Sequence, residues 1–458
     1  MQSRRDQVEA YSYTTGRLNA ALVCGEPDTG ERPHQRVVVS VTASVLLGLL
    51  IAAGFLIYGF VVPGASTGWR TPGTLVVEKE TGARYLFDGV ALRPVLNYTS
   101  ARLALGKAPT IAYVSASALR GLPVGGPVGI AGAPESLPAS AAGDYWTVCA
   151  PPAGGKSTVD TTLSIAALPD PAGTTPLSGD RAVLVSAKDG TRHLIWRGRR
   201  HRIATDWVAR VLGYDGDSQP VSDTWLGLVP PGSDLAAPSI AGLGEPGPQV
   251  DGKPTRIGEI FAAPAAGGSR FYVLQRDGLS PLSDTAYPIV AGDPAAAAAR
   301  GGGTGPVELS PAAKVSLPVS AARVLPDDLP PVPPMIANPG AGQAWCVRTA
   351  VTTGRADIVA AAPPPVGSPQ PGGNAVLRTS RTVAGVSVAA GAGGLVSPDG
   401  TGTAYSAISD AGVRYPLASR DVLTALGYTP SSALVVPPAL LELLPVGPLL
   451  DPARAAAG

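Results

Sequence analysis

The run "VVVSVTASVLLGLLIAAGFLIYGFVV", from Val37 to Val62, contains no charged residue and divides the chain into a short N-terminal part and a long C-terminal part. A helix with a rise of about 1.5 Å per residue and this length crosses a hydrocarbon core of about 30 Å. The run is too long, and begins too late, for a cleaved signal peptide. The alternative, a buried helix of a soluble domain, is uncommon for so long an uncharged run. We therefore predict one transmembrane helix over 37–62.

Basic residues before the span predict its orientation, because positively charged flanks stay in the cytoplasm. The N-terminus is therefore expected inside and the rest of the chain outside. This predicts a single-pass protein of the inner (cytoplasmic) membrane whose bulk is extracytoplasmic, or periplasmic. The formal net charge of +1 provides no general attraction to nucleic acid. The basic residues before the span are Arg4, Arg5, Arg17, Arg32 and Arg36.

Composition and cysteine content fit an outer body of short elements. The 458 residues include 57 glycines and 48 prolines, and only 15% are charged, which favours many turns over long helices. Cys24 falls on the reducing side, whereas Cys149 and Cys346 share a compartment in which a disulfide persists. We expect these two to pair; two unpaired buried thiols are the alternative.

Before the span, apolar residues recur at intervals of three and four and stop at Gly25. This pattern indicates a short amphipathic helix, which is marginal by itself in water. We predict that its apolar face docks on a partner or on the inner face of the membrane; a frayed, solvated helix is the alternative. The residues of this docking face are Val8, Tyr11, Leu18 and Leu22.

Beyond the span, one pattern occurs four times: a strand, a glycine turn, a second strand and a short helical stretch that ends in glycine. Glycine suits both the turn and the left-handed position after a helix. We interpret the pattern as four ββα-type repeats; coincidence in a chain rich in glycine and proline is the alternative. The turn glycines are Gly82, Gly190, Gly278 and Gly400, and the helix-ending glycines are Gly106, Gly213, Gly301 and Gly427.

A Trp/Cys segment follows the first and the third repeat, as "DYWTVC" and "QAWC". This order predicts an α+β fold: a single N-terminal transmembrane helix, then an elongated extracytoplasmic body of four small ββα-type repeats around a central β-rich core, with pseudo-twofold symmetry. A Cys149 to Cys346 bridge would join the two halves, with Trp146 and Trp345 as its core neighbours. The predicted segments are a cytoplasmic helix and linker (1–36), the span (37–62), a linker (63–74), repeat 1 (75–135), a core segment with Cys149 (136–180), repeat 2 (181–240), repeat 3 (255–330), a core segment with Cys346 (331–393) and repeat 4 (394–452).

The stretch "CAPPAGGKST", residues 149–158, contains a relaxed P-loop pattern. Two prolines remove backbone N–H donors, and β-branched residues follow where a P-loop has a helix. The stretch also adjoins an outer cysteine, where ATP is scarce. We interpret it as a linker and predict no cofactor, with ATP bound only if the alternative, a nucleotide hydrolase, is right. The weak phosphate-binding candidates are Gly155, Lys156 and Ser157.

The sequence offers no catalytic set and no metal-ligand cluster, since the outer cysteines lack histidines at zinc spacing. The strongest charge cluster is "RGRRHR", Arg197 to Arg202, on the second repeat. It suits contact with anionic lipid, cell-wall polymer or an acidic partner loop. A solvated turn is the alternative interpretation.

The chain resembles EccB, the B component of the actinobacterial type VII (ESX) secretion membrane complex. The resemblance rests on "QVEAYSYTTGRLNAAL" before a single span, the four outer repeats and the Trp-associated cysteines, and it covers essentially the whole chain. It implies a structural subunit that anchors and assembles the extracytoplasmic part of the complex for protein export across the inner membrane. It also implies EccC, EccD, EccE and the mycosin protease as partners, and a homo-dimer or higher oligomer formed through the outer domain.

Two other functions stay open at this point. The EccB family is sometimes described as having ATPase activity, for which this sequence offers only the degenerate loop, so we lean against an enzyme. Small repeated αβ units also suit a cell-wall (peptidoglycan) binding module.

Overall fold

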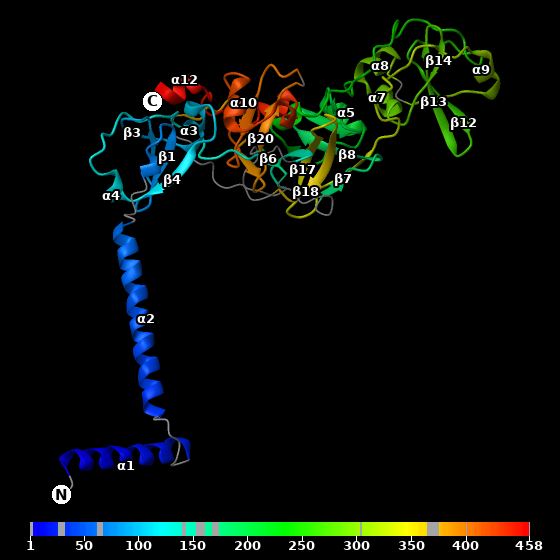
Figure 1. Cartoon of the computed structure of the whole chain (residues 1–458). Helices are drawn as coiled ribbons and strands as arrows, with labels where there is room; N and C mark the ends of the chain where they lie inside the picture. Colours follow the sequence, from blue (N-terminus) through cyan, green and yellow to red (C-terminus); the bar gives the residue numbers. More distant parts are fainter. Residues whose placement is uncertain are drawn as a thin grey trace. The chain divides into compact units, whose positions relative to one another are not determined.

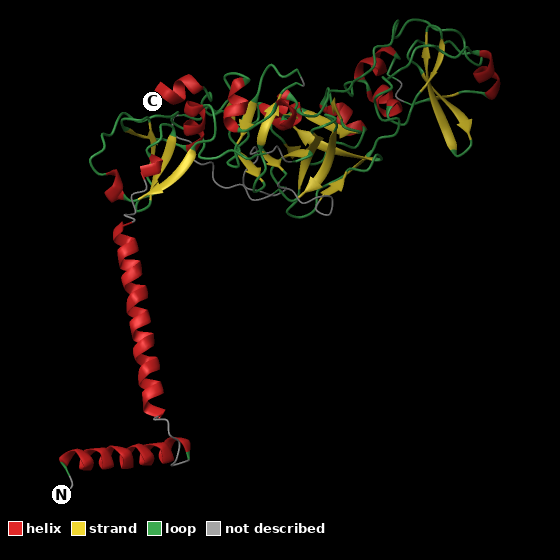
Figure 2. Ribbon diagram, viewed as in Figure 1, coloured by secondary structure: helices red, strands yellow, loops and turns green. Residues whose placement is uncertain are grey.

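The computed structural model describes residues 3–25, 33–61, 67–139, 143–152, 161–166, 174–302, 305–363, 375–399 and 401–457. By its contacts the chain divides into two compact units. Both long helices belong to the first unit, and most of the β-strands belong to the second (Figure 2). The first unit comprises Met1–Ala83, Phe87–Ala91 and Ile111–Pro123, and the second comprises Arg84–Leu86, Leu92–Thr110 and Val124–Gly458.

The N-terminal helix α1 runs over Arg4–Cys24. Ser3 caps its first turn, because the Ser3 hydroxyl accepts from the Asp6 backbone N–H while the Asp6 carboxylate accepts from the Ser3 backbone N–H. The helix ends at Gly25, which is left-handed with φ 75°. The short helix and its glycine stop, both predicted from the sequence, are confirmed.

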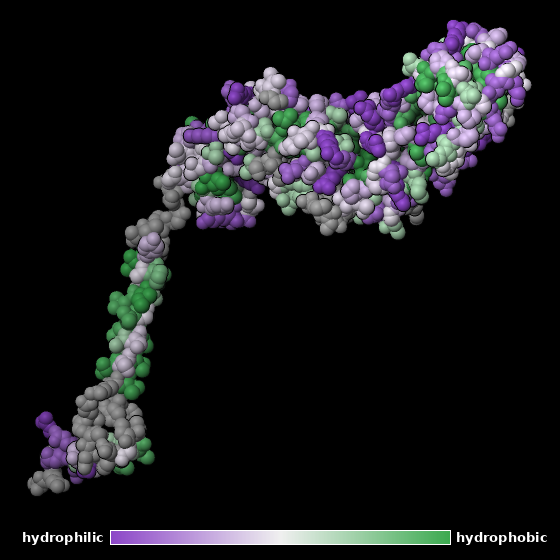
Figure 3. Space-filling model, turned by 90° about the vertical axis from the view of Figure 1, so that its right-hand side faces the viewer, coloured by the Kyte–Doolittle hydropathy of each residue, from purple (hydrophilic) through white to green (hydrophobic). Residues whose placement is uncertain are grey.

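The second helix, α2, runs over Pro33–Val61 and contains an apolar stretch over Val37–Tyr58 with a mean hydropathy of 2.4. None of that stretch is buried against the rest of the chain, and Figure 3 shows hydrophobic side chains along it. An apolar helix of this length needs a non-aqueous partner, and a lipid bilayer of about 30 Å matches its length. Within the described ranges α2 alone is long and apolar enough to cross a membrane, in agreement with the predicted span.

Four small sheets in the described part of the chain share one strand order. Three strands are hydrogen-bonded in the order of the chain, and a fourth lies on the outer side of the first. In the last three sheets this fourth strand is parallel to the first. We call each sheet with its helices a module, numbered one to four along the chain. The orders are β3-β2-β1-β4, β10-β9-β8-β11, β14-β13-β12-β15 and β22-β21-β20-β23.

The strands of the modules are short. Those of module one are β1 (Thr74–Glu78), β2 (Arg84–Phe87), β3 (Leu92–Pro94) and β4 (Thr110–Val114), and those of module two are β8 (Arg181–Ser186), β9 (Arg192–Trp196), β10 (Arg199–Arg202) and β11 (Gln219–Pro220). Those of module three are β12 (Ile260–Ala265), β13 (Gly268–Gln275), β14 (Gly278–Pro281) and β15 (Val307–Glu308), and those of module four are β20 (Gly394–Ser397), β21 (Ser406–Ile408), β22 (Arg414–Pro416) and β23 (Leu434–Val435). A further strand, β16 (Met335–Ile336), pairs with β8.

Each module has a helical segment between its third and fourth strands and a short helix after the fourth. The first set is α3 (Tyr98–Leu105), α5 (Asp206–Val211), α7 (Ala286–Gly292) with α8 (Pro294–Ala299), and α10 (Asp421–Leu426). The second set is α4 (Ala116–Leu119), α6 (Asp223–Gly227), α9 (Pro311–Ser316) and α11 (Pro438–Leu441). The predicted ββα pattern, with two strands and one helix, therefore omitted two of the four strands and the second helix of each module.

The four glycines predicted to end these helical segments are all left-handed, a conformation that lacks a steric penalty only in glycine. Their φ angles are 68° at Gly106, 73° at Gly213, 84° at Gly301 and 77° at Gly427. Short elements complete the chain: the 3₁₀ turns η1 (Thr67–Trp69) and η2 (Pro430–Ser432) and the last helix, α12 (Pro452–Ala457).

A six-stranded sheet of order β19-β6-β5-β17-β18-β7 connects the two Trp/Cys segments. Its two middle strands, β5 and β17, are antiparallel, and each forms a hairpin with the next strand of its own segment. The third strand of each segment pairs with the hairpin of the other segment, β7 with β18 and β19 with β6. The strands are β5 (Tyr145–Cys149), β6 (Thr162–Ile165), β7 (Thr174–Pro176), β17 (Ala344–Ala350), β18 (Ala356–Ala361) and β19 (Gly385–Val388).

The largest hydrophobic core packs one face of this central sheet against modules two and four (Figure 1). Two further contacts pair the modules: α3 of module one packs against α10 of module four and against α12, and α5 of module two packs against α7 of module three. The Arg102 Nε also donates to the Ala425 carbonyl across the first of these contacts, at 3.0 Å.

One turn glycine allows a sharp test of the module geometry. At Gly278 φ is 142°, and an added Cβ would lie 2.1 Å from the Pro318 carbonyl oxygen, which accepts the Leu279 N–H. At Gly190 φ is 86°, but no atom lies within 4 Å of the corresponding Cβ position. We expect Gly190→Ala to lower the free energy of unfolding by about 1 kcal/mol and Gly278→Ala by about 3 kcal/mol, because only the second adds a steric clash. Equal losses in thermal denaturation would contradict the described contact.

Candidate functional site

A disulfide lies between the two middle strands of the central sheet. Cys149 on β5 is directly opposite Cys346 on β17, and their Cα atoms are 4.0 Å apart. Both side chains are fully buried. The bond joins hairpins whose cysteines are 197 positions apart in the sequence, and it holds the register of β5 against β17. The predicted pairing of the two cysteines is confirmed.

The two tryptophans of these segments lie on the other face of the sheet. Trp146 and Trp345 belong to the large core, whereas Cys149 and Cys346 form a separate small cluster with neighbouring small residues. In a strand, residues separated by an odd number of positions point to opposite faces. The Trp-to-Cys offsets in both segments are odd. The prediction that the tryptophans neighbour the bridge was therefore wrong about the face.

Beyond the disulfide, the same face of the sheet carries charged and aromatic side chains. Arg348, two residues after Cys346, is directly opposite Asp357 on β18. Its guanidinium carbon lies 3.8 Å from the centroid of the Tyr145 ring on β5. Arg355 donates from Nη2 and Nε to the Asp357 Oδ1, at 3.1 and 3.2 Å. This face of the sheet therefore presents the guanidinium groups of Arg348, which donates to the Thr174 hydroxyl at 3.4 Å, and of Arg355, which forms an ion pair with Asp357.

A tight turn in module two lies beside these residues. The two-residue loop between β9 and β10 consists of Arg197 and Gly198, with φ angles of 47° and 72°. Positive φ at both positions is typical of a type I′ hairpin. Arg197 adopts this left-handed conformation although it is not a glycine. Its guanidinium carbon lies 4.5 Å from the centroid of the Trp196 ring. Arg199, directly opposite Trp196, donates to the Pro231 carbonyl at 3.1 Å.

The remaining residues of the predicted "RGRRHR" cluster have structural contacts. Arg200 donates to the Leu226 carbonyl at 2.8 Å, and Arg202 forms an ion pair with Asp234. His201 is fully buried, and its Nδ1 lies 2.9 Å from the Ser233 carbonyl oxygen. Of the cluster, therefore, the exposed Arg197 and Arg199 have guanidinium groups available to a ligand.

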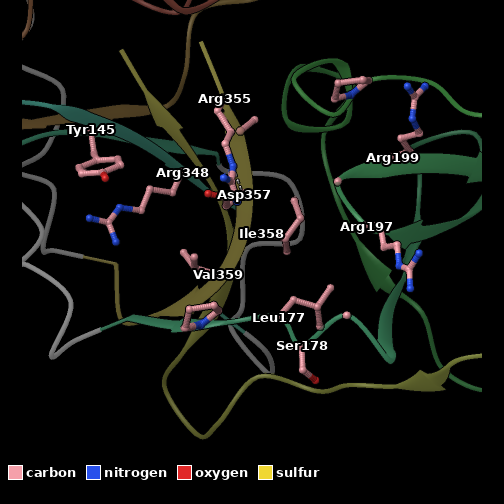
Figure 4. A pocket seen from close by; sticks show the side chains of 15 residues that line it. Tyr145, Leu177, Ser178, Arg197, Arg199, Arg348, Arg355, Asp357, Ile358 and Val359 are labelled. Atoms are coloured by element: carbon pink, nitrogen blue, oxygen red, sulfur yellow. Dashed lines mark hydrogen bonds and ion pairs between the residues drawn. The ribbon is translucent and has the colours of Figure 1, made fainter. Parts of the chain in front are cut away.

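Together the two sets of residues line a cleft of about 710 Å³, which we call the basic cleft. Figure 4 shows Tyr145 and Arg348 on one side of it and Arg197 and Arg199 on the other, with Leu177 and Ile358 between them. Its volume is in the usual range for ligand sites. The lining residues are Tyr145, Pro176, Leu177, Ser178, Gly179, Arg197, Gly198, Arg199, Pro230, Arg348, Arg355, Ala356, Asp357, Ile358 and Val359.

Two titratable groups behind the turn have shifted pKa values. Burial, with a smaller contribution from Arg200, lowers the pKa of His193 on β9. Hydrogen bonds from the backbone and side chain of Ser233 hold the pKa of Asp328 below its usual range. Neither residue lines the basic cleft, whose described cationic side chains are all arginines.

The remaining site residues predicted from the sequence fall into two groups, those outside the described residues and those exposed on α1. The phosphate-binding candidates Gly155, Lys156 and Ser157 lie outside the described residues. The four docking-face residues are on α1 and are 63 to 80% exposed. In the described part of the chain no group of three His, Cys, Asp or Glu side chains is placed to hold a metal ion.

Sequence reasoning missed the half of the cleft that lies on the central sheet. Tyr145, Arg348, Arg355 and Asp357 come from strands that are far apart in the chain, and their proximity depends on the pairing of β5 with β17. The spacing of Tyr145 before Cys149 and of Arg348 after Cys346 was the available signal, since even offsets in a strand share a face.

Comparisons with known proteins agree with this architecture. The family model "Type VII secretion system ESX-1, transport TM domain B" matches residues 1–458. "ESX-5 secretion system ATPase EccB5" of Mycobacterium marinum is 30% identical over 485 aligned positions, which cover 99% of this chain and 93% of that protein.

Two solved structures show the same fold. One is a chain of the periplasmic assembly from the ESX-5 inner membrane complex, with a TM-score of 0.66 and 25% identity over 86% of this chain and 97% of that one. The other is a chain of the EccB3 dimer from the ESX-3 core complex, with a TM-score of 0.60 and 26% identity over 83% of this chain and 99% of that one.

One apolar helix and a disulfide-linked mixed α/β body define a membrane-anchored subunit of a secretion apparatus. The chain belongs to the EccB family, whose members are membrane subunits of ESX (type VII) secretion complexes. The periplasmic assembly of its structural neighbours fits an inner-membrane location with an extracytoplasmic body.

Proposed function

We propose that this chain is a structural scaffold of an ESX membrane complex: α2 anchors it, α1 docks in the cytoplasm, and the outer body assembles the extracytoplasmic part for protein export. The observation that carries the proposal is the division of the chain into an exposed apolar helix and a disulfide-linked body, within a family match over residues 1–458. The arginines before the span favour an N-terminus in the cytoplasm.

The body is best interpreted as four copies of one module related by a pseudo-twofold axis. A twofold rotation that places module one on module three and module four on module two would place the contact between α3 and α10 on the contact between α7 and α5. It would also exchange β5 with β17 and β7 with β19, each of which pairs with the opposite hairpin. The β7 to β18 pairing is antiparallel and the β19 to β6 pairing parallel, so the symmetry is approximate.

The partners that we propose are EccC, EccD, EccE and the mycosin protease, with a homo-dimer or higher oligomer formed through the outer body. A solved relative, EccB3 of the ESX-3 core complex, is a dimer in its own structure. Purification of a tagged full-length chain from membranes, followed by identification of the co-purifying subunits, tests this directly. Recovery of the chain without any other ESX membrane subunit would contradict the scaffold role.

The exposed apolar face of α1 gives a sharper test. Leu18 and Leu22 are 63% and 80% exposed, and burial of two leucine side chains against a partner is strongly favourable. We expect the double change Leu18→Asp with Leu22→Asp to reduce co-purification of the cytoplasmic partner by about tenfold or more, without loss of membrane insertion. Tyr13→Asp, at an exposed position on the opposite face of α1, is the matched control. Equal losses in both variants would show that no single face docks.

An ATP-hydrolysing role is the second candidate, favoured by the name of the ESX-5 relative, "ESX-5 secretion system ATPase EccB5". Its test is Lys156→Ala, at the lysine of the P-loop-like stretch. Under the scaffold proposal secretion is unchanged. Loss of secretion by a normally assembled complex would favour the enzyme instead.

A further inference from the structure

We propose that the basic cleft binds an extended acidic peptide segment of a partner protein. The proposal rests on the charge, the layout and the floor of the cleft, and it does not depend on the proposed scaffold function.

The charge of the cleft is strongly one-sided. Within the part of the chain that the structure describes, its lining contains four arginines and one acidic residue, Asp357, which already accepts from Arg355. Among the described residues, neither Arg197 nor Arg199 forms an ion pair; they contact the Trp196 ring and the Pro231 carbonyl. Guanidinium groups bound only to neutral partners retain their attraction for carboxylates.

The layout of the arginines favours several anionic groups over one. Figure 4 shows Arg197 and Arg199 on the module-two side and Arg348 on the central-sheet side, with side chains that do not converge on one point. A compact anion such as phosphate is usually held by converging donors. Carboxylates spaced along an extended chain reach both sides.

The floor of the cleft suits the apolar side chains that lie between the acidic residues of such a peptide. Pro176 and the half-buried Leu177 contribute apolar surface, and Tyr145, 42% exposed, is held under the Arg348 guanidinium. Apolar floors with a few polar groups at the rim are typical of specific ligand sites. An extended segment that alternates acidic and apolar side chains matches this surface, because alternate residues of an extended chain point to opposite sides.

The cleft is held in place by two local devices. The disulfide fixes the register of β5 against β17, and so places Tyr145 and Arg348 on the same face. The type I′ turn holds Arg197 at the tip of the hairpin. This position requires a left-handed backbone, which is unfavourable for a residue with a side chain.

The probe for the test is a labelled synthetic peptide of alternating glutamate and leucine, titrated into the purified full chain in detergent. The comparison peptide carries glutamine in place of each glutamate. We expect saturable binding of the acidic peptide that weakens with added salt, and about tenfold or more weaker binding of the glutamine peptide. No saturable binding of the acidic peptide would overturn the proposal.

Charge reversals then locate the site. Arg199→Glu and Arg197→Glu should each weaken binding of the acidic peptide by about tenfold or more. Arg270→Glu makes the same change in charge at an exposed position of module three and should change it less than about twofold. Equal weakening by all three would show non-specific attraction and contradict the proposal.

Two further outcomes are decisive. Competition by inorganic phosphate or ATP at concentrations equal to that of the acidic peptide would assign the cleft to a compact anion instead. Binding of vesicles containing anionic lipid, lost on Arg199→Glu while peptide binding persists, would assign it to a membrane surface. If a charge reversal impairs folding, Arg197→Ala at the exposed turn is a second variant. We expect it to fold normally and to bind the acidic peptide more weakly.

Discussion

Replacement of both Cys149 and Cys346 by alanine should lower the free energy of unfolding of the outer body by about 5 kcal/mol. In the chain-entropy model a cross-link stabilises by restricting the unfolded chain, and the effect grows with the length of the closed loop. Here the cysteines are 197 positions apart, which makes the loop long. Both side chains are buried beside small apolar residues, so alanine introduces no unpaired polar group.

The measurement is chemical denaturation of the full chain, followed through the transition in which the central sheet unfolds. Cys24→Ala is the matched control and should leave this transition unchanged. A reductant should destabilise the wild-type protein but not the double alanine variant. If the double variant unfolds within about 1 kcal/mol of the wild type, the hydrogen-bonded ladder of β5 and β17 by itself determines the stability of the sheet.

Trp225→Ala should lower the free energy of unfolding by about 3–5 kcal/mol, the usual cost of removing a large aromatic side chain from a core. Trp225 lies on α6 of module two and is fully buried in the core that this module shares with the central sheet and module four. Its loss therefore opens a cavity at the point where three parts of the body meet.

Trp225→Phe is the matched variant for this position. The indole Nε1 is buried without a hydrogen-bond partner among the described residues, so phenylalanine removes an unpaired donor while it retains most of the apolar volume. We expect a loss of about 1–2 kcal/mol. Thermal melting measures both variants, and equal losses would show that the polar group, not the packing, determines the effect.

Several features were predictable because their signals are local. The apolar run of α2 is visible as an uncharged stretch long enough for a bilayer. The glycine after each helical segment is needed for a left-handed backbone, and all four predicted positions have that conformation. Strand-turn-strand patterns were detectable for the same reason, since alternation and turn residues depend on near neighbours only. The predicted turn glycines Gly82 and Gly190 lie between the first and second strands of their modules. Gly278 instead begins the third strand of its module, and Gly400 is outside the described residues.

Other features could not be predicted because they depend on pairing between distant segments. The fourth strands of modules two, three and four are two residues long, too short to show a period, and Gln219–Pro220 even ends in proline. The register of β5 against β17 is a second feature that could not be predicted. Cys149 lies opposite Cys346 in only one of the possible registers, and a slip by one residue would move Arg348 to the other face of the sheet.

The opposite orientation of Trp345 and Cys346 shows a limit of a different kind. The odd offset was present in the sequence, but it has meaning only if the segment is a strand, and Trp345 could equally have been a neighbour of the bridge in a turn. The structure shows that this segment is the strand β17, and Trp345 and Cys346 therefore lie on opposite faces of the sheet.

By itself, the sequence determined the apolar span, the N-terminal helix and the glycine-ended helical segments, because each depends on residues within a few turns of one another. The pairing of Cys149 with Cys346 was expected because a single span places both on the same side of the membrane. Only the tertiary structure decided that Arg197 and Arg199 border the same cleft as Tyr145 and Arg348. The physical reason is that a cleft is formed by side chains from separate strands. Their juxtaposition is set by the ladder of the central sheet and by the packing of module two against it, and not by any local preference of the chain.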